Sequence, residues 1–323
     1  MTFQGLSLTD LEAAQARIGT RVHRTPLLSS TLIGARIGAG LWLKCESLQR
    51  TGSFKPRGVL NKLSQLDPGA RNAGVVTVSA GNHAQALAWA AREVGVPAVV
   101  VMPAKASPAK IEASRSYGGE VILHGTALEA FAKARELATE RGLAFIHPFD
   151  DAQIVAGAAS VGLEILDQLA SVTTVVVPVG GGGLISGIAA AIKQSNPAIR
   201  VFGVEPEGCA AMRASLDAGH AVRLDAVQSV ADGLAAPMAG ELNFAIVREW
   251  VDEVVLVSDV EIVDAMEPIA SRARLVVEPS GAAGVAALLA GRIPLGADDT
   301  VVAVLSGGNV GMEDFAALIT RDA

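Results

Sequence analysis

Short apolar runs alternate along the chain with segments in which apolar residues recur at helical spacing. The runs are rich in β-branched residues and are bounded by Gly, Pro or polar residues, which is typical of buried strands. They cover residues 75–78, 98–102, 121–123, 175–179, 201–204, 254–257 and 301–305. The pattern therefore predicts strands that are shielded from water on both faces.

Three of the intervening segments, at 82–94, 108–117 and 127–141, predict amphipathic helices. A glycine follows each of them, and glycine is a common signal for the end of a helix. Strands that alternate with helices predict an α/β fold with parallel sheets and crossover helices. Polar stretches at 46–51 and 147–150 indicate a unit of three or four strands inserted into a larger domain.

Composition excludes several classes of protein. Of the 323 residues, 50% are hydrophobic and 18% are charged, so the chain is not disordered and can bury a large core. The net charge of −7 and the lack of a Lys/Arg cluster argue against nucleic acid as a partner. The uncharged stretch 175–192 is interrupted by Pro178 and glycines, so we expect no membrane span. The polar N-terminus favours a cytoplasmic location.

A run of four glycines follows the apolar run at 175–179 and precedes a helical segment. Gly180, Gly181, Gly182 and Gly183 allow backbone conformations in which successive N–H groups point inward and bind an anion. Such a nest at a helix N-terminus suits a phosphate group. The run matches neither a P-loop nor a dinucleotide fingerprint, because it lacks the Gly-Lys-Ser/Thr and the third glycine that these need. A tight turn without a ligand is the alternative.

Two further segments carry candidate chemistry. Lys55 follows Phe54 and lies between glycines at 52 and 58, so an apolar neighbour could shield its amine from water. Desolvation lowers a lysine pKa, and a neutral amine can form a Schiff base. The segment 79–85 joins a strand to a helix, and its backbone N–H groups suit a carboxylate. Polar Ser306 and Asn309 follow the last strand, at the edge where ligands collect in α/β folds.

Together these segments resemble the fold-type II pyridoxal-phosphate enzymes, whose fold is like that of the tryptophan synthase β subunit. Within that group the chain is similar to the threonine/serine dehydratases (ammonia-lyases), which are close to the serine racemases. The matching stretches are residues 44–55, 79–83, 180–183, 231–233, 278–281 and 306–309. The resemblance implies two open, mostly parallel twisted sheets, a large domain of residues 1–48 and 149–323, and a small inserted domain of residues 49–148. It also implies a homodimer or homotetramer.

The resemblance assigns roles to individual residues around pyridoxal 5'-phosphate. Lys55 would hold the cofactor covalently and then act as the base on the substrate Cα–H. The four glycines would bind the cofactor phosphate, Asn82 the 3'-hydroxyl, and Ser306 would face the pyridine nitrogen. Two further groups complete the site. The faces of the ring would meet Phe54 and Gly233, with Glu278 also at the cofactor, and the substrate carboxylate would bind the loop of Ser79, Ala80, Gly81, Asn82 and His83.

The expected reaction is dehydration and deamination of a β-hydroxy amino acid, first L-threonine and then L-serine. Serine racemases place a serine where this chain has Ala80, which has no proton to give, so elimination is favoured over racemisation. A racemase, or a dehydratase for hydroxyaspartate or for a compound of compatible-solute catabolism, is the alternative. We expect no extra cation for a second carboxylate at 126–130.

Two other features of the resembling enzymes are not expected here. Metal-binding members need an aspartate where this chain has Ala211, which leaves only Glu205 and the carbonyl of Cys209 as possible ligands. We therefore expect no bound metal. The segment after residue 311 is too short for a regulatory domain, so we expect none at the C-terminus.

Overall fold

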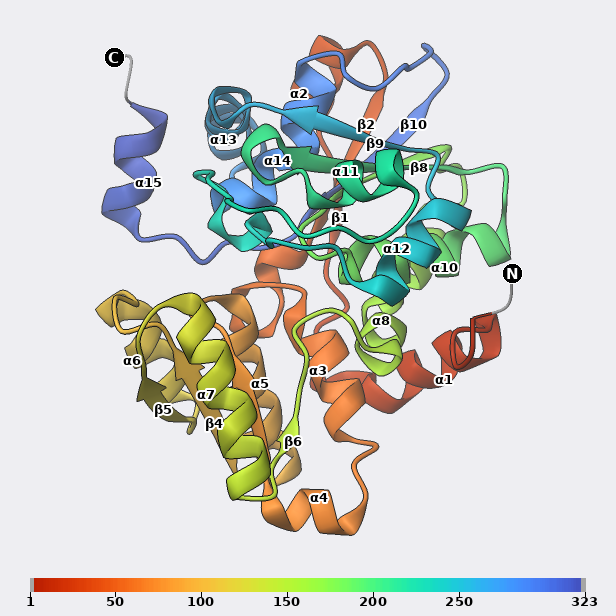
Figure 1. Cartoon of the computed structure of the whole chain (residues 1–323). Helices are drawn as coiled ribbons and strands as arrows, with labels where there is room; N and C mark the ends of the chain where they lie inside the picture. The colour runs from red at the N-terminus through yellow and green to blue at the C-terminus, as the bar shows by residue number, and fades with distance from the viewer. Residues whose placement is uncertain (1–2, 321–323) are drawn as a thin grey trace.

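The computed structural model describes residues 3–320 and contains two sheets, each in its own half of the molecule (Figure 1). The larger sheet has the strand order β1-β2-β10-β7-β8-β9. Its strands are β1 (Leu27–Ser29), β2 (Gly40–Cys45), β7 (Thr174–Pro178), β8 (Arg200–Pro206), β9 (Glu253–Val257) and β10 (Thr300–Leu305). All neighbours are parallel except β1 and β2. The expected α/β fold with mostly parallel sheets is confirmed.

The smaller sheet has the order β5-β4-β3-β6, and all of its strand pairs are parallel. Its strands are β3 (Val75–Val78), β4 (Ala98–Met102), β5 (Glu120–Leu123) and β6 (Ala144–Phe145). These strands lie between β2 and β7 in the sequence, and in Figure 1 they form the lower half with the helices that join them. The sheet falls inside the range 49–148, although the domain boundaries themselves stay a prediction.

Helices cover the sheets and join successive strands. Those before or within the smaller unit are α1 (Leu8–Ile18), α2 (Thr31–Ile37), α3 (Lys55–Leu63), α4 (Pro68–Ala73), α5 (Asn82–Val94), α6 (Pro108–Ser116) and α7 (Ala127–Glu140). Those that follow are α8 (Ala152–Ala158), α9 (Ser160–Gln168), α10 (Gly183–Ser195), α11 (Ala211–Ala218), α12 (Glu241–Trp250), α13 (Asp259–Ala273), α14 (Pro279–Leu289) and α15 (Met312–Ile319). None of the helices among residues 3–320 is long and apolar enough to cross a membrane.

Both faces of the larger sheet are buried, as the continuous apolar runs predict. Along β10, Val301, Ala303 and Leu305 belong to one hydrophobic cluster, while Val302 and Val304 belong to another. Successive side chains of a strand point to opposite faces, so the two clusters lie on opposite sides of the sheet. A polar or charged ligand therefore cannot enter through either face, and the strand ends become the place for a site.

Chain segments that follow the carboxyl ends of strands meet between the two sheets. The loop after β3 begins at Ser79, the loop after β7 contains Gly180, and Ser306 follows β10 directly. The N-terminus of α3, which carries Lys55, lies in the same region and bonds to the β10 loop through Phe54 N–H and the Ser306 carbonyl, 3.1 Å apart. The fold thus brings four distant segments together at one place.

Candidate active site

One cavity of about 480 Å³ lies between the two sheets and is lined by segments from both. It is lined by every residue that the sequence assigned to a cofactor or to a substrate carboxylate: Phe54, Lys55, Ser79, Ala80, Gly81, Asn82, His83, Gly180, Gly181, Gly182, Gly183, Gly233, Glu278 and Ser306. These positions span more than two hundred residues of sequence, so only the fold makes them neighbours. The roles of the individual residues stay predictions.

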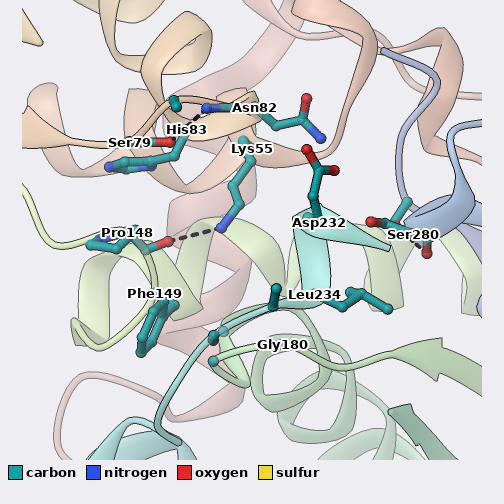
Figure 2. A pocket seen from close by; sticks show the side chains of 18 of the residues that line it. Lys55, Ser79, Asn82, His83, Pro148, Phe149, Gly180, Asp232, Leu234 and Ser280 are labelled. Carbon is teal, nitrogen blue, oxygen red and sulfur yellow. Dashed lines mark hydrogen bonds between the residues drawn. The ribbon is translucent and has the colours of Figure 1, made fainter. Parts of the chain in front are cut away.

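Lys55 is the first residue of α3, and its side chain points into the cavity (Figure 2). Its Nζ donates a hydrogen bond of 3.0 Å to the Pro148 carbonyl and lies 5.0 Å from the centre of the Phe54 ring. Burial lowers the pKa of Lys55 to about 8, although the nearby Glu278 acts in the opposite direction. With this pKa roughly a tenth of the amine is neutral at pH 7, far more than for an ordinary lysine, so a nucleophile or base is available.

The loop between β3 and α5 presents backbone and ring groups to the cavity. The Ser79 hydroxyl accepts a hydrogen bond of 3.1 Å from the Gly81 N–H, and no side chain caps the N-terminus of α5. Burial lowers the pKa of His83 well below its usual value, and the positive charge of Lys55 lowers it further. The ring is therefore neutral, and its nitrogens have no well-formed hydrogen bond among residues 3–320. A helix terminus without a side-chain cap can bind a carboxylate, and the ring of His83 lies beside it in the cavity wall.

Asn82, at the start of α5, belongs to a chain of polar side chains. Its Nδ2 donates a hydrogen bond of 2.6 Å to Glu278 Oε1, and its Oδ1 accepts one of 2.8 Å from Asn309. Burial raises the pKa of Glu278 to about 7, even though the bond from Asn82 opposes this shift. The two side chains come from the two halves of the molecule, so this contact fixes the β3–α5 loop against the start of α14.

The four glycines form a cradle at the N-terminus of α10, as the sequence predicted. Gly182 has a φ of +94°, which favours glycine, and it caps α10 without a side-chain bond. A Cβ at Gly181 would lie 2.5 Å from atoms of the Phe149 ring, and one at Gly180 would lie 3.2 Å from the Leu234 backbone. Side chains are excluded, so the backbone N–H groups of the helix start remain open to an anion.

Opposite the glycines, small polar groups border the cavity. The Ser306 hydroxyl donates a hydrogen bond of 3.4 Å to the Ser280 carbonyl, and the buried Ser280 hydroxyl has no partner among the described residues. A Cβ at Gly233 would lie 2.7 Å from that hydroxyl, so the wall stays flat at this point. A phosphate cradle, an amine, an amide and a hydroxyl around a flat slot fit pyridoxal phosphate, which carries a phosphate, an aldehyde, a 3'-hydroxyl and a ring nitrogen.

The possible metal ligands lie outside the cavity. Glu205 is the last residue but one of β8 and accepts hydrogen bonds of 2.8 Å from the N–H groups of Met212 and Arg213, so its carboxylate caps α11. Burial raises the pKa of Glu205 to about 7 despite these bonds. Within residues 3–320, no group of three or more His, Cys, Asp or Glu side chains is arranged to hold a metal ion.

Sequence reasoning overlooked two features of the cavity. The helix that begins at Pro108 brings Lys110 to the wall, where it forms an ion pair with Asp232 of the opposite half. The ring of Phe149 packs directly against the glycine cradle. Lys110 gave no signal, because a lone lysine on a helix usually belongs to a solvated face. The stretch 147–150 was noticed only as a polar break.

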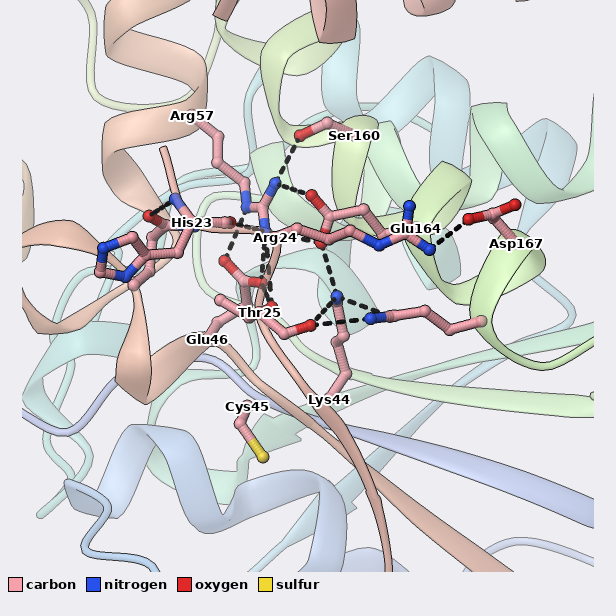
Figure 3. Close-up of polar contacts among 12 residues, drawn as sticks. His23, Arg24, Thr25, Lys44, Cys45, Glu46, Arg57, Ser160, Glu164 and Asp167 are labelled. Carbon is pink, nitrogen blue, oxygen red and sulfur yellow. Dashed lines mark hydrogen bonds and ion pairs between the residues drawn. The ribbon is translucent and has the colours of Figure 1, made fainter. Parts of the chain in front are cut away.

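Outside the cavity lining lies a buried ion cluster, which we define as Lys44, Glu46, Arg57 and Glu164 (Figure 3). Arg57 is two residues beyond Lys55 and donates to Glu46 at 2.8 Å and to Glu164 at 2.6 and 2.9 Å. Lys44 Nζ donates to Glu164 at 2.6 Å. Burial would raise the pKa of Glu46, but Arg57 and Lys44 hold it below its usual range. The cluster ties α3 to β2 and α9.

Comparison with known proteins gives a consistent family. The family model for pyridoxal-phosphate dependent enzymes matches residues 18–307. An L-threonine ammonia-lyase of Thermotoga maritima is 43% identical over 317 residues, which are 98% of this chain and 79% of that protein. The structure of maize serine racemase has a TM-score of 0.92 at 38% identity and covers 98% of this chain and 97% of its own. Threonine deaminase isoform 2 of Solanum lycopersicum has a TM-score of 0.90 at 36% identity, covering 98% and 94%.

Proposed function

The chain belongs to the family of pyridoxal-phosphate dependent enzymes, and we propose that it is an ammonia-lyase that dehydrates and deaminates a β-hydroxy amino acid. L-threonine, giving 2-oxobutyrate and ammonia, is the preferred substrate, and L-serine, giving pyruvate, is the second. The observation that carries the proposal is the cavity in which Lys55, the β3–α5 loop and the glycine cradle meet, in a chain similar to L-threonine ammonia-lyases over nearly its whole length.

Different residues of the cavity bind the phosphate and the ring of the cofactor. The chemistry that bound pyridoxal phosphate supplies is an electron sink next to the substrate Cα. The cradle of Gly180, Gly181, Gly182 and Gly183 holds the phosphate, while Asn82 and Ser306 orient the ring from its other edges. Glu278 keeps Asn82 in place, because it accepts the bond that the Asn82 amide donates.

The substrate is held and deprotonated by groups from the smaller half and from α3. The N–H groups of the β3–α5 loop and the neutral ring of His83 bind the substrate carboxylate. Lys55 Nζ takes the proton from the substrate Cα, which its lowered pKa of about 8 permits near neutral pH. The apolar Phe54 and Phe149 rings exclude water from the amine and from the cradle.

Racemisation is the second candidate, and the similarity to maize serine racemase is what favours it. Ala80 argues against it, because this residue of the carboxylate loop has no hydroxyl with which to return a proton on the face opposite Lys55. We therefore expect pyruvate to form from L-serine faster than D-serine. Chiral analysis of the amino acid that remains during turnover distinguishes the two, and faster D-serine formation would replace the lyase proposal with a racemase.

Release of 2-oxo acid tests the lyase directly. The cofactor-loaded protein is incubated with L-threonine, L-serine and 3-hydroxyaspartate, and the products are identified by mass. We expect 2-oxobutyrate to form fastest, and Lys55→Ala to abolish release while the protein stays folded. A parent protein that retains bound cofactor and releases nothing from L-threonine or L-serine would contradict the proposal and point to an unusual hydroxy amino acid.

We also propose that the protein is a homodimer or homotetramer in the cytoplasm. This proposal rests on the resemblance to the fold-type II pyridoxal-phosphate enzymes. Sedimentation of the purified holoenzyme measures the oligomer, and a mass equal to one chain at micromolar concentration would contradict this proposal. Cell fractionation decides the location.

A further inference from the structure

Lys110 and Asp232 form an ion pair in the wall of the cavity, between the two halves of the molecule. Lys110 lies on α6 beside the smaller sheet, whereas Asp232 belongs to a short 3₁₀ turn, Asp232–Leu234, that lies in the sequence between β8 and β9. Lys110 Nζ donates directly to Asp232 Oδ2; the Lys110 side chain is 35% exposed and that of Asp232 is 60% exposed, at the open edge of the wall. Both residues line the same cavity as Lys55.

The other titratable side chains of the cavity wall already have roles. Among the described lining residues these are Lys55, His83 and Glu278. Lys55 carries the chemistry, His83 is neutral, and Glu278 is bonded to Asn82. Lys110 is therefore the one remaining cation of the described wall, and its charge is already compensated by Asp232.

The pair also acts on the interior of the cavity. The negative charge of Asp232 raises the pKa of Glu278, whereas the positive charge of Lys110 lowers it, although both effects are smaller than that of burial. The two charges are thus close enough to the cofactor residues to be felt there. Figure 2 shows the Asp232 carboxylate on the side of the cavity where the Asn82 amide lies.

We propose that Asp232 is a specificity-determining residue. Its ion pair with Lys110 prevents this cation from binding a second carboxylate of the substrate. The second carboxylate of a dicarboxylic β-hydroxy amino acid would find the positive charge of Lys110 already neutralised by Asp232, and the negative charge of Asp232 would repel it. An uncharged side chain such as that of threonine or serine meets no penalty. The inference rests on the proposed function and explains how a pocket that contains a spare cation selects neutral hydroxy amino acids.

Removal of one charge tests the proposal. In Asp232→Asn, Lys110 is uncompensated, so the ratio of kcat/KM for 3-hydroxyaspartate to that for L-threonine is expected to rise by about tenfold or more. The reaction on 3-hydroxyaspartate is the same elimination. One water is released in the elimination and one is consumed when the product is hydrolysed, so the net products are ammonia and a four-carbon 2-oxo dicarboxylate. Calorimetry on the holoenzyme gives a second readout, the tighter binding of succinate, with butyrate as the monocarboxylate control.

Two further variants identify the cause. In the double variant Asp232→Asn with Lys110→Met, the kcat/KM ratio and the affinity for succinate should return to the parent values, because the side chain at position 110 no longer carries a positive charge. The matched control is Glu120→Gln, which removes the carboxylate of the exposed Arg141–Glu120 ion pair of the same half, away from the cavity wall. This control should leave the ratio at the parent value.

The outcomes separate this inference from the proposed function. A parent protein without activity on L-threonine contradicts the function. If the parent is active but Asp232→Asn raises neither the kcat/KM ratio nor the affinity for succinate, the inference is contradicted and the proposed function is not. An increase in the ratio or in succinate affinity that persists in the double variant, which lacks Lys110, also contradicts the inference. If Asp232→Asn loses turnover, succinate binding by the folded variant still decides the question.

Discussion

Lys55 shows how the surroundings of one side chain set its chemistry. The sequence indicated only an apolar neighbour, Phe54, and two flanking glycines. In the structure Lys55 is half-buried in the wall of the cavity, and its amine is hydrogen bonded to the Pro148 carbonyl and placed near Glu278. Desolvation favours the neutral amine and Glu278 favours the charged one, and desolvation prevails. The group is therefore poised to exchange a proton near neutral pH.

This balance predicts the pH dependence of covalent cofactor capture. The pKa of Lys55 is lowered from its ordinary value to about 8, so the neutral fraction rises across that value and not near 10.5. When apoprotein is mixed with pyridoxal phosphate, the rate should increase by about tenfold from pH 7 to pH 9 and then level off. Stopped-flow absorbance measures the rate. A rate that still climbs steeply beyond pH 10, or that persists in Lys55→Ala, would contradict the assignment.

A second residue-scale prediction concerns the glycine cradle. In Gly181→Ala the new Cβ would meet the Phe149 ring at 2.5 Å, so the cradle must shift and its N–H groups must turn away from the phosphate. The affinity of apoprotein for pyridoxal phosphate should fall by about tenfold or more, a loss of about 1.4 kcal/mol. Gly296→Ala is the control, because its Cβ meets only Asp299 Oδ2 at 3.8 Å. Equal affinities for the two variants in an absorbance titration would argue against a phosphate at the cradle.

At the scale of the element, the apolar runs located the strands that are buried on both faces. The predicted ranges at 75–78 and 98–102 coincide with β3 and β4, and the helix at 82–94 coincides with α5, which ends at Gly95 with a φ of +67°. β2 was missed because Lys44 interrupts its apolar pattern. The charge of the buried Lys44 is compensated by Glu164, which lies 120 residues further along the chain, and the local sequence gives no sign of that pair.

The same limit applies to the site. Local sequence indicated the glycine cradle, because four glycines between a strand and a helix have few other uses. It could not indicate Lys110 or Phe149, whose roles depend on contacts with the other half of the molecule. The ring-face roles came only from resemblance to a family, whereas the strand-to-helix turn at 79–85 had already suggested a place for a carboxylate. Tertiary contacts, unlike turn chemistry, leave no periodic pattern in the chain.

The buried ion cluster predicts a stability difference within one helix, α9. Glu164 accepts bonds from both Lys44 and Arg57, so Glu164→Gln leaves positive charge uncompensated in the interior. We expect a loss of about 3 kcal/mol in the free energy of unfolding. Asp167→Asn, three residues along, removes the partner of Arg24 from a largely exposed pair and should cost less than about 1 kcal/mol. Denaturant unfolding compares them, and equal midpoints would refute a structural role for the cluster.

The cluster also links this element to the chemistry. Arg57 and Lys55 lie on the first turn of α3, and Arg57 fixes that turn against Glu46, the residue that follows β2, the strand next to β10. Ser306 follows β10, so the amine and the hydroxyl are held at either side of the cavity by one connected framework. A buried polar cluster is seldom the most stable solution, and here its geometry orients the helix that carries the amine.

At the scale of the whole molecule, the site exists because two sheets end at one cavity. The half with the larger sheet supplies the glycine cradle and Ser306, whereas the half with the smaller sheet supplies the β3–α5 loop and Lys110. Each half alone lacks some of the residues that are proposed to bind the cofactor and the substrate. The central claim is therefore that this junction holds the cofactor, and that Lys55 is the residue to which it is joined.

Reductive trapping tests that claim most directly. Treatment of the holoenzyme with borohydride fixes the cofactor to the lysine that holds it, and peptide mass spectrometry then identifies that residue. The account predicts one modified peptide, which contains Lys55, and no modification in Lys55→Ala. A pyridoxyl group on Lys110, the other lysine of the cavity wall, or on a lysine outside the cavity would contradict it.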